Sequence, residues 1–322
     1  MTTTVAPAPA TDYVSVTATP EKAYWLDTDL MEVLVSREQS GGQYDVIRGT
    51  VQPGGGPPPH RHSREDQMFY VVDGEFEFIC NDQVFAASAG ASVFLPRGCV
   101  HTFKNVGDTA GTLIVFTTPS GFAEFVADAG NEASDRAAVP VVTTGALVKL
   151  ADAAEDFGIE LTPGWQPTRK CAPPQPLYDL WVTGLHVRIL LGNAQTNNQF
   201  AVAEITAHPG DFVPPHTHDP EDEMFYVLEG EVEFDVPGGP ITAPPGTFIH
   251  IPRGIFHGFR NASEIDAKLL DIHTPGGFED FFVEAGTLWP SLSVNPPPGA
   301  WVDVPRFVRI AQAHGMEVAK PA

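Results

Sequence analysis

The sequence predicts an all-β protein made of two tandem domains, each with a small helical appendage. Short apolar or alternating segments are separated by Gly, Pro, Asn and Asp, which is typical of closely spaced antiparallel strands. The chain of 322 residues contains 31 prolines and 30 glycines, in keeping with many tight turns. One series of residues also occurs twice at a constant offset, from His60 to His216 and from Asn105 to Asn261. Two domains of about 150 residues each fit this length.

The strands are expected in two matching sets. In the first half the apolar or alternating runs are residues 32–36, 44–51, 68–72, 75–79, 92–96 and 112–118. In the second half they are residues 187–192, 200–206, 224–229, 231–236, 247–252 and 268–274. Because side chains alternate between the two faces of a strand, these runs predict sheets with one face in a core.

Helices are expected only near the end of each half. The segments 121–130 and 277–286 place aromatic residues at helical spacing and end in glycine. Residues 146–161 and 306–318 contain amphipathic helices that end at Gly158 and Gly315, one residue out of the general offset.

The repeat and the local composition divide the chain into three parts. Residues 1–18 are expected to form a flexible leader, 19–172 the N-terminal domain and 173–322 the C-terminal domain. The proline-rich passage TRKCAPPQPLY marks the junction near residue 172. The three cysteines are odd in number and unmatched between the copies, so we expect reduced thiols in a cytoplasmic protein.

Charge and hydropathy exclude some partners. The net charge is −23, from 18 basic and 41 acidic residues, and such a surface repels nucleic acid and anionic membranes. No run approaches the roughly 18 apolar residues of a membrane-spanning helix. We therefore expect neither nucleic acid nor membrane as a partner. A homodimer through the sheet faces and packing of the two domains within one chain remain alternatives.

The candidate chemistry of the second copy comes from three histidines and a carboxylate. His216 and His218 are two residues apart and point to the same side of a strand. Glu223 follows a turn, and His257 follows the turn Pro252-Arg253-Gly254. Three neutral imidazoles with one carboxylate suit a divalent first-row metal that keeps open coordination positions. A metal-free set of hydrogen-bonded core side chains is the alternative.

The first copy repeats this set with one change. His60, His62 and His101 match the three histidines, but Gln67 stands where the second copy has Glu223. An amide oxygen can coordinate a cation, yet it adds no negative charge and cannot act as a base. We expect these four residues to bind metal, without carrying the chemistry.

The spacing of these residues resembles the two-part signature of the cupin superfamily, G-x5-H-x-H-x4-E-x6-G followed by G-x5-P-x-G-x2-H-x3-N. The second copy meets it at every position and the first lacks only the carboxylate; the residues are Gly210, His216, His218, Glu223, Gly230, Gly246, Pro252, Gly254, His257 and Asn261, and Gly54, His60, His62, Gln67, Gly74, Gly90, Pro96, Gly98, His101 and Asn105. The resemblance implies a bicupin, in which two tandem cupin domains each form a jelly-roll β-barrel around a metal site.

Within the superfamily the chain is similar to the quercetin 2,3-dioxygenase group. The similarity rests on His-Thr-His with the following EMFYVLEGE and on TPGGFEDFF after the barrel. The resemblance implies a metal-dependent dioxygenase for a phenolic or enolic aromatic substrate, in which Glu223 of the C-terminal domain is both ligand and general base. Oxalate decarboxylases are bicupins too, but their tryptophan-containing first motif and glutamate-bearing lid are not evident in this sequence.

The cofactor and the reaction leave alternatives open. We expect iron, while Mn, Ni, Co, Cu and Zn also accept three histidines and a glutamate. A non-oxidative isomerase, decarboxylase or lyase would use the same metal as a Lewis acid and would turn over without oxygen. A ligand-binding bicupin without catalysis would return its ligand intact. Dioxygen and a small aromatic or enolic molecule are the partners that the first interpretation requires.

Overall fold

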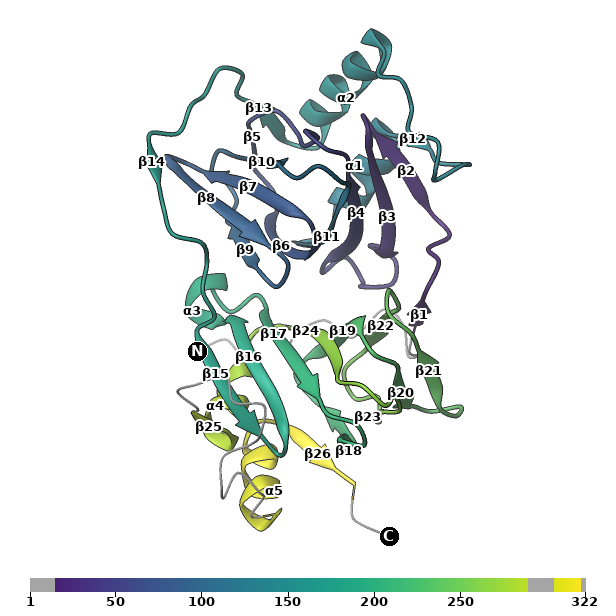
Figure 1. Cartoon of the computed structure of the whole chain (residues 1–322), viewed down its shortest axis with the longest axis vertical. Coiled ribbons are helices and arrows are strands. Elements are labelled where there is room, and N and C mark those ends of the chain that lie inside the picture. The colour runs from purple at the N-terminus through teal and green to yellow at the C-terminus, as the bar shows by residue number, and fades with distance from the viewer. Residues whose placement is uncertain (1–14, 289–303, 320–322) are drawn as a thin grey trace. The chain divides into compact units, whose positions relative to one another are not determined.

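The computed structural model describes residues 15–288 and 304–319 of the chain. It divides into two compact units, one of residues 20–175 and the other of residues 176–322 together with those up to Thr19. Each unit contains two sheets and a few helices, which confirms the predicted all-β class with helical appendages (Figure 1).

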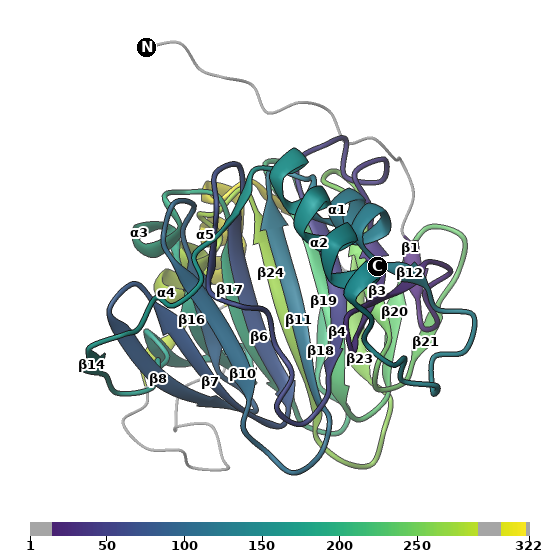
Figure 2. The same cartoon turned by 90° about the horizontal axis from the view of Figure 1, so that it is seen from above.

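The unit of residues 20–175 is a barrel of two facing sheets; we call it the first barrel. In spatial order, one sheet comprises β12 (Asn131–Glu132), β2 (Ala23–Leu26), β3 (Asp29–Val35), β4 (Asp45–Val51), β11 (Gly111–Thr118), β6 (Asp66–Asp73) and β9 (Ser92–Leu95). The other comprises β13 (Ile159–Leu161), β5 (His60–His62), β10 (His101–Asn105), β7 (Glu75–Cys80), β8 (Gln83–Ser88) and β14 (Arg169–Lys170). Its helices are α1 (Phe122–Ala129) and α2 (Thr144–Asp156). Figure 2 shows the antiparallel neighbours β6 and β11 side by side.

The other unit repeats this plan; we call it the second barrel. One sheet comprises β1 (Ser15–Thr17), β22 (Phe248–Ile251), β19 (Asp222–Glu229), β24 (Ala267–Thr274), β17 (Ala201–Ala207), β16 (Leu185–Leu191), β15 (Tyr178–Val182) and β25 (Thr287–Leu288). The other comprises β21 (Ile241–Ala243), β20 (Val232–Asp235), β23 (His257–Asn261), β18 (Phe212–His218) and β26 (Met316–Val318). Its helices are α3 (Asn193–Thr196), α4 (Glu279–Ala285) and α5 (Val304–Ala313).

The core of each barrel follows from strand alternation. In β7 the phenylalanines Phe76 and Phe78 are fully buried, while the alternating Glu75 and Glu77 are exposed. In β20 the buried Val232 and its neighbour Phe234 occupy the corresponding positions. The inward residues of both sheets form a large hydrophobic cluster in each barrel. This packing surrounds the interior of each barrel with buried apolar side chains.

The predicted helices are confirmed. After two of them the chain forms short strands that the sequence pattern did not indicate. Gly158 and Gly315 follow α2 and α5 with φ angles of +74° and +76°, a conformation that favours glycine. The next three residues form β13 and β26, which pair with the strands of the two His-x-His motifs. In Figure 1, α2 lies next to β13 and α5 next to β26.

The predicted leader and junction differ in detail from the structure. Ser15–Thr17, which we expected within the flexible leader, form β1 and pair with β22. The rest of the leader, residues 1–14, lies outside the described residues. The boundary between the two units falls between Gln175 and Pro176.

Candidate metal centres

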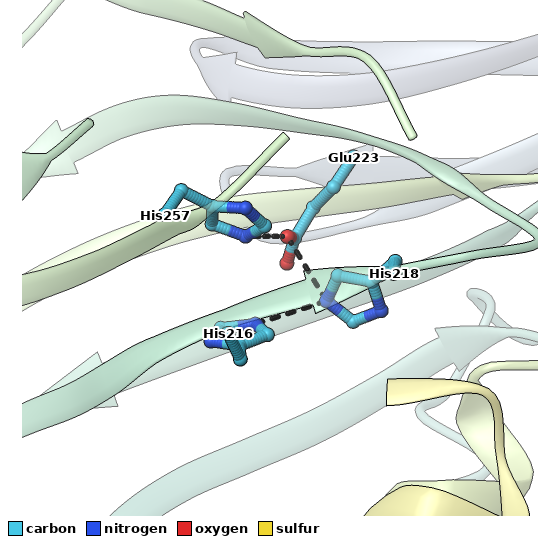
Figure 3. Close-up of side chains that lie close together, drawn as sticks. All are labelled: His216, His218, Glu223 and His257. Carbon is cyan, nitrogen blue, oxygen red and sulfur yellow. Dashed lines mark hydrogen bonds and ion pairs between the residues drawn. The ribbon is translucent and has the colours of Figure 1, made fainter. Parts of the chain in front are cut away.

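The site of the second barrel is assembled from three strands. His216 and His218 lie on β18 with inward side chains, and His257, the first residue of β23, is the register partner of His216. Glu223 comes from β19 in the facing sheet. The turn before His257 is fixed by Gly254, with φ +78°, whose N–H donates to the carbonyl of His218 over 2.7 Å. Figure 3 shows the four side chains pointing toward one another.

The ligand atoms of these four residues converge; we call this set the second cage. Nε2 of His216 lies 3.0 Å from Nε2 of His218, which lies 3.3 Å from Oε2 of Glu223. The same carboxylate oxygen lies 2.5 Å from Nε2 of His257. All four side chains are buried, and the ligand atoms lie within 4.8 Å of one another. The structure therefore gathers the four predicted residues around one point.

Hydrogen bonds fix which histidine nitrogen faces the centre. Nδ1 of His216 donates to the Pro214 carbonyl and Nδ1 of His257 to the Ile255 carbonyl, both over 2.9 Å. In the neutral ring the remaining nitrogen, Nε2, then carries a lone pair. Burial, followed by the neighbouring His257, lowers the pKa of His216 to about 3. Lone pairs of neutral histidine nitrogens and a buried carboxylate oxygen face one another here. A cation bound between them would offset the repulsion of these electron-rich atoms.

The second cage has an outer group that the sequence analysis missed. Nε2 of His273 on β24 lies 3.2 Å from Oε1 of Glu223, and Nδ1 of His273 lies 3.5 Å from Oδ1 of Asp271. Burial raises the pKa of Glu223, but His218, His257 and His273 lower it further, so that it lies well below its usual range. Burial lowers the pKa of His273, yet Asp271 and Glu223 raise it to about 9. His273 therefore orients one carboxylate oxygen while the other faces the cage.

The first barrel holds the matching first cage of His60, His62, His101 and Gln67. Nε2 of His60 lies 3.1 Å from Nε2 of His62, and Nε2 of His101 lies 3.0 Å from the amide oxygen of Gln67. Nδ1 of His60 donates to the Pro58 carbonyl over 2.9 Å. Burial and then the neighbouring histidines hold the pKa of His60 well below its usual range. The donor set fits a divalent metal, with one negative charge fewer than in the second cage.

Neither acidic neighbour replaces the missing carboxylate of the first cage. Oε2 of Glu65 lies 3.3 Å from Nδ1 of His62, the ring nitrogen that faces away from the centre. Asp66 pairs with Arg97 over 2.6 Å. At the position of His273 the first barrel has Thr117. The first cage therefore lacks both the carboxylate ligand and the histidine that would orient it.

The cavities beside the two cages differ in size. The cavity beside the second cage measures about 50 Å³, and its walls include Phe278, Phe281, Phe282 and Phe307. The ring centroid of Phe278 lies 4.4 Å from that of His218. Beside the first cage the cavity measures about 260 Å³ and is lined by apolar side chains with a few polar groups. The complete cage thus has little free space, and the incomplete one has room for a ligand.

The comparisons with known proteins agree with this architecture. The Cupin domain family matches residues 47–117 and again residues 203–273. Quercetin 2,3-dioxygenase of Bacillus subtilis (strain 168) is 25% identical over 318 residues, which cover 92% of this chain and 93% of that protein. The family signature therefore occurs in both barrels, and the relative matches nearly the whole chain.

Two solved structures share the fold at low sequence identity. Oxalate decarboxylase of Lactobacillus farciminis superposes with a TM-score of 0.58 at 14% identity, covering 83% of this chain and 87% of that chain. The 11S globulin of Wrightia tinctoria superposes with a TM-score of 0.59 at 15% identity, covering 84% and 87%. Within the described residues, no helix has the length and apolar character needed to cross a membrane.

Proposed function

Since this chain is a bicupin, we propose that it is a metal-dependent dioxygenase that acts on a phenolic or enolic substrate at the second cage. The observation that carries the proposal is the buried Glu223 carboxylate, with one oxygen close to the Nε2 atoms of His218 and His257 in the cage that His216 completes, and the other 3.2 Å from His273. The similarity to a quercetin 2,3-dioxygenase along 92% of the chain supports the reaction class. Iron is the metal that we propose for the cage.

In this proposal each residue of the second cage has a distinct task. His216, His218 and His257 would hold the metal through their Nε2 atoms. The bound metal would act as a Lewis acid and stabilise the deprotonated substrate hydroxyl. Glu223 accepts the proton of that hydroxyl as general base, which needs direct contact with the substrate. Phe278 covers His218 and limits the access of water to the site.

Oxygen uptake tests the proposal. The metal-reconstituted protein is given quercetin in an oxygen electrode, beside Glu223→Gln and His257→Ala. We expect uptake in the wild type and at least a 100-fold lower rate in both variants, since removal of a general base alone costs about 10²–10⁴-fold. His101→Ala in the first cage is the matched control and should retain uptake. Equal loss in His101→Ala and His257→Ala would contradict chemistry at the second cage.

The small cavity favours a second candidate function. A cavity of about 50 Å³ is smaller than the roughly 150 Å³ that hold one benzene ring, so an aromatic substrate enters only if the phenylalanines move. A non-oxidative decarboxylase or lyase for a small enolisable acid would need no such movement. Product formed under nitrogen at an unchanged rate would favour this candidate, and an absolute need for oxygen would exclude it.

A further inference from the structure

The first barrel has two cysteines without counterparts in the second barrel, and their side chains are in contact. Cys80 is the last residue of β7, and Cys99 lies two residues before β10, the antiparallel neighbour of β7 (Figure 2). Both are free thiols, and their side chains are hydrogen-bonded to each other. Cys99 is 5% exposed, whereas Cys80 is only half-buried. One thiol of the pair can therefore meet a dissolved reagent, and the other is shielded.

The repeat shows that the fold itself does not require sulfur at either position. Cys80 and Cys99 correspond to Val236 and Ile255 of the second barrel. All four side chains pack against the hydrophobic cluster of their own barrel. A buried cysteine that serves only packing behaves as a small apolar residue and needs no second thiol beside it. Both positions differ together between the barrels, and the two thiols meet, which favours a shared role.

Hydrogen bonds hold the backbone on both sides of the cysteine pair. The N–H of Asn81 donates to the Val100 carbonyl over 2.7 Å, and the N–H of Val100 donates to Oδ1 of Asn81 over 3.2 Å. The N–H of Cys99 donates to the Pro96 carbonyl over 3.1 Å. A disulfide requires Cα atoms about 4.4–6.8 Å apart and a sulfur–sulfur bond of about 2.0 Å. Thiols that already contact each other on such held segments need little movement to form that bond.

Cys99 also positions one ligand of the first cage. Nδ1 of His101 donates to the Cys99 carbonyl over 3.1 Å and lies 3.7 Å from Sγ of Cys99. In the second barrel the Ile255 carbonyl accepts the corresponding bond from His257. A Cys99 sulfur drawn toward Cys80 would leave the ring of His101 and shift the carbonyl that orients it. Loss of such an outer partner typically lowers metal affinity about 10- to 100-fold.

We propose that Cys80 and Cys99 are a reversible dithiol–disulfide pair, and that formation of their disulfide weakens metal binding at the first cage. The oxidant is a small-molecule disulfide. The Cys80 thiolate attacks this disulfide and releases one thiolate, and the Cys99 thiolate then attacks the Cys80 sulfur and releases the second. Two protein thiols lose two electrons, the small disulfide is reduced to two thiols, and the two cysteine protons end on them.

Peptide mass spectrometry after treatment with oxidised glutathione under nitrogen tests for the disulfide, since trypsin cleaves between the two cysteines at Arg97. In the full-length wild type the Cys80–Cys99 disulfide should be the main product, and dithiothreitol should reverse it. Cys171→Ser, which removes the thiol outside the pair, is the matched control and should form the same disulfide. Cys80→Val should form none, and Cys99→Ile should accumulate a glutathione adduct on Cys80.

Competition with a chelator measures the effect on the first cage, with Co²⁺ as probe. The full-length protein carries His257→Ala, so that the second cage is incomplete and the first cage is reported. We expect the Co²⁺ affinity to be at least 10-fold lower in the oxidised than in the reduced protein. The same treatment of His257→Ala with Cys80→Val should change nothing. By linkage, Co²⁺ should oppose disulfide formation by the same factor, and a 10-fold change shifts the midpoint potential by about 30 mV.

Thermal unfolding of each variant shows that it is folded, and if Cys99→Ile fails to fold, Cys80→Val carries the test. A wild type that keeps free thiols or pairs through Cys171, or a Co²⁺ affinity that is equal in the oxidised and reduced states, would overturn the proposal. Neither measurement involves oxygen uptake, so a failure here is distinguishable from a failure of the function proposed for the second cage.

Discussion

The phenylalanines beside the second cage are predicted to decide which substrates reach it. Phe282 and Phe307 line the small cavity, and the first barrel has Val126 and Leu150 at the matching positions. The double variant Phe282→Val, Phe307→Leu therefore gives the second barrel the side chains of the first. We expect a wider cavity and lower stability, and each effect can be measured separately.

The cost in stability follows from the two cavity volumes. They differ by about 210 Å³, and cavity creation costs about 24 cal/mol per Å³, so complete opening corresponds to about 5 kcal/mol. Phe307 is half-buried, and α5 can move inward when its side chain is shortened. We therefore expect a loss of about 2–5 kcal/mol in the free energy of unfolding, measured by urea denaturation.

Substrate selectivity gives the functional measurement. If the phenylalanines limit access to the second cage, kcat/KM for oxygen uptake should rise at least 10-fold for three-ring quercetin relative to one-ring catechol. Adding Glu223→Gln in the same background should abolish uptake of both. An unchanged ratio, or a loss in stability below about 0.5 kcal/mol, would refute the claim that these side chains close the cavity.

Three further predictions concern the cages themselves. Glu223→Gln should lower metal affinity at the second cage at least 10-fold and Gln67→Glu should raise it at the first, with metal content and chelator competition as the measurements. His273→Thr, which copies Thr117, should weaken metal binding about 10- to 100-fold through a misoriented carboxylate, and an unchanged dissociation constant would contradict this role. The pKa of His216 is about 3 in the folded state and about 6.5 in the unfolded state. Between pH 6.5 and pH 3 the unfolded state therefore binds more protons, so the free energy of unfolding falls as the pH falls through this range. Metal-free His216→Gln should therefore lose about 2 kcal/mol less than the wild type between pH 6.5 and 5, as urea unfolding at both pH values would show.

The fold and the cage residues were accessible from the sequence because both depend on local spacing. His216 and His218 share a face because strand side chains alternate. The repeat drew attention to His257 and Glu223, because His101 and Gln67 have the same spacing in the first copy. Such regularities can be recognised without knowledge of the tertiary structure. The exchange of Glu223 for Gln67 was visible for the same reason.

Other features depend on contacts between distant segments, which local patterns do not encode. The strand Met316–Val318 is three residues long and is defined by its pairing with His216 and His218. His273 lies 50 residues after Glu223 in the sequence and has no histidine partner in the repeat, so no spacing rule drew attention to it. Its alternation with Asp271 and Leu269 on one face of β24 is the signal that could have found it.

The two barrels differ in the charge of the cage and in the volume of the cavity beside it. A divalent metal with three neutral imidazoles keeps two positive charges, and in the second cage Glu223 removes one of them. The first cage offers only the neutral amide of Gln67, so an apolar cavity of about 260 Å³ would contain an uncompensated metal charge.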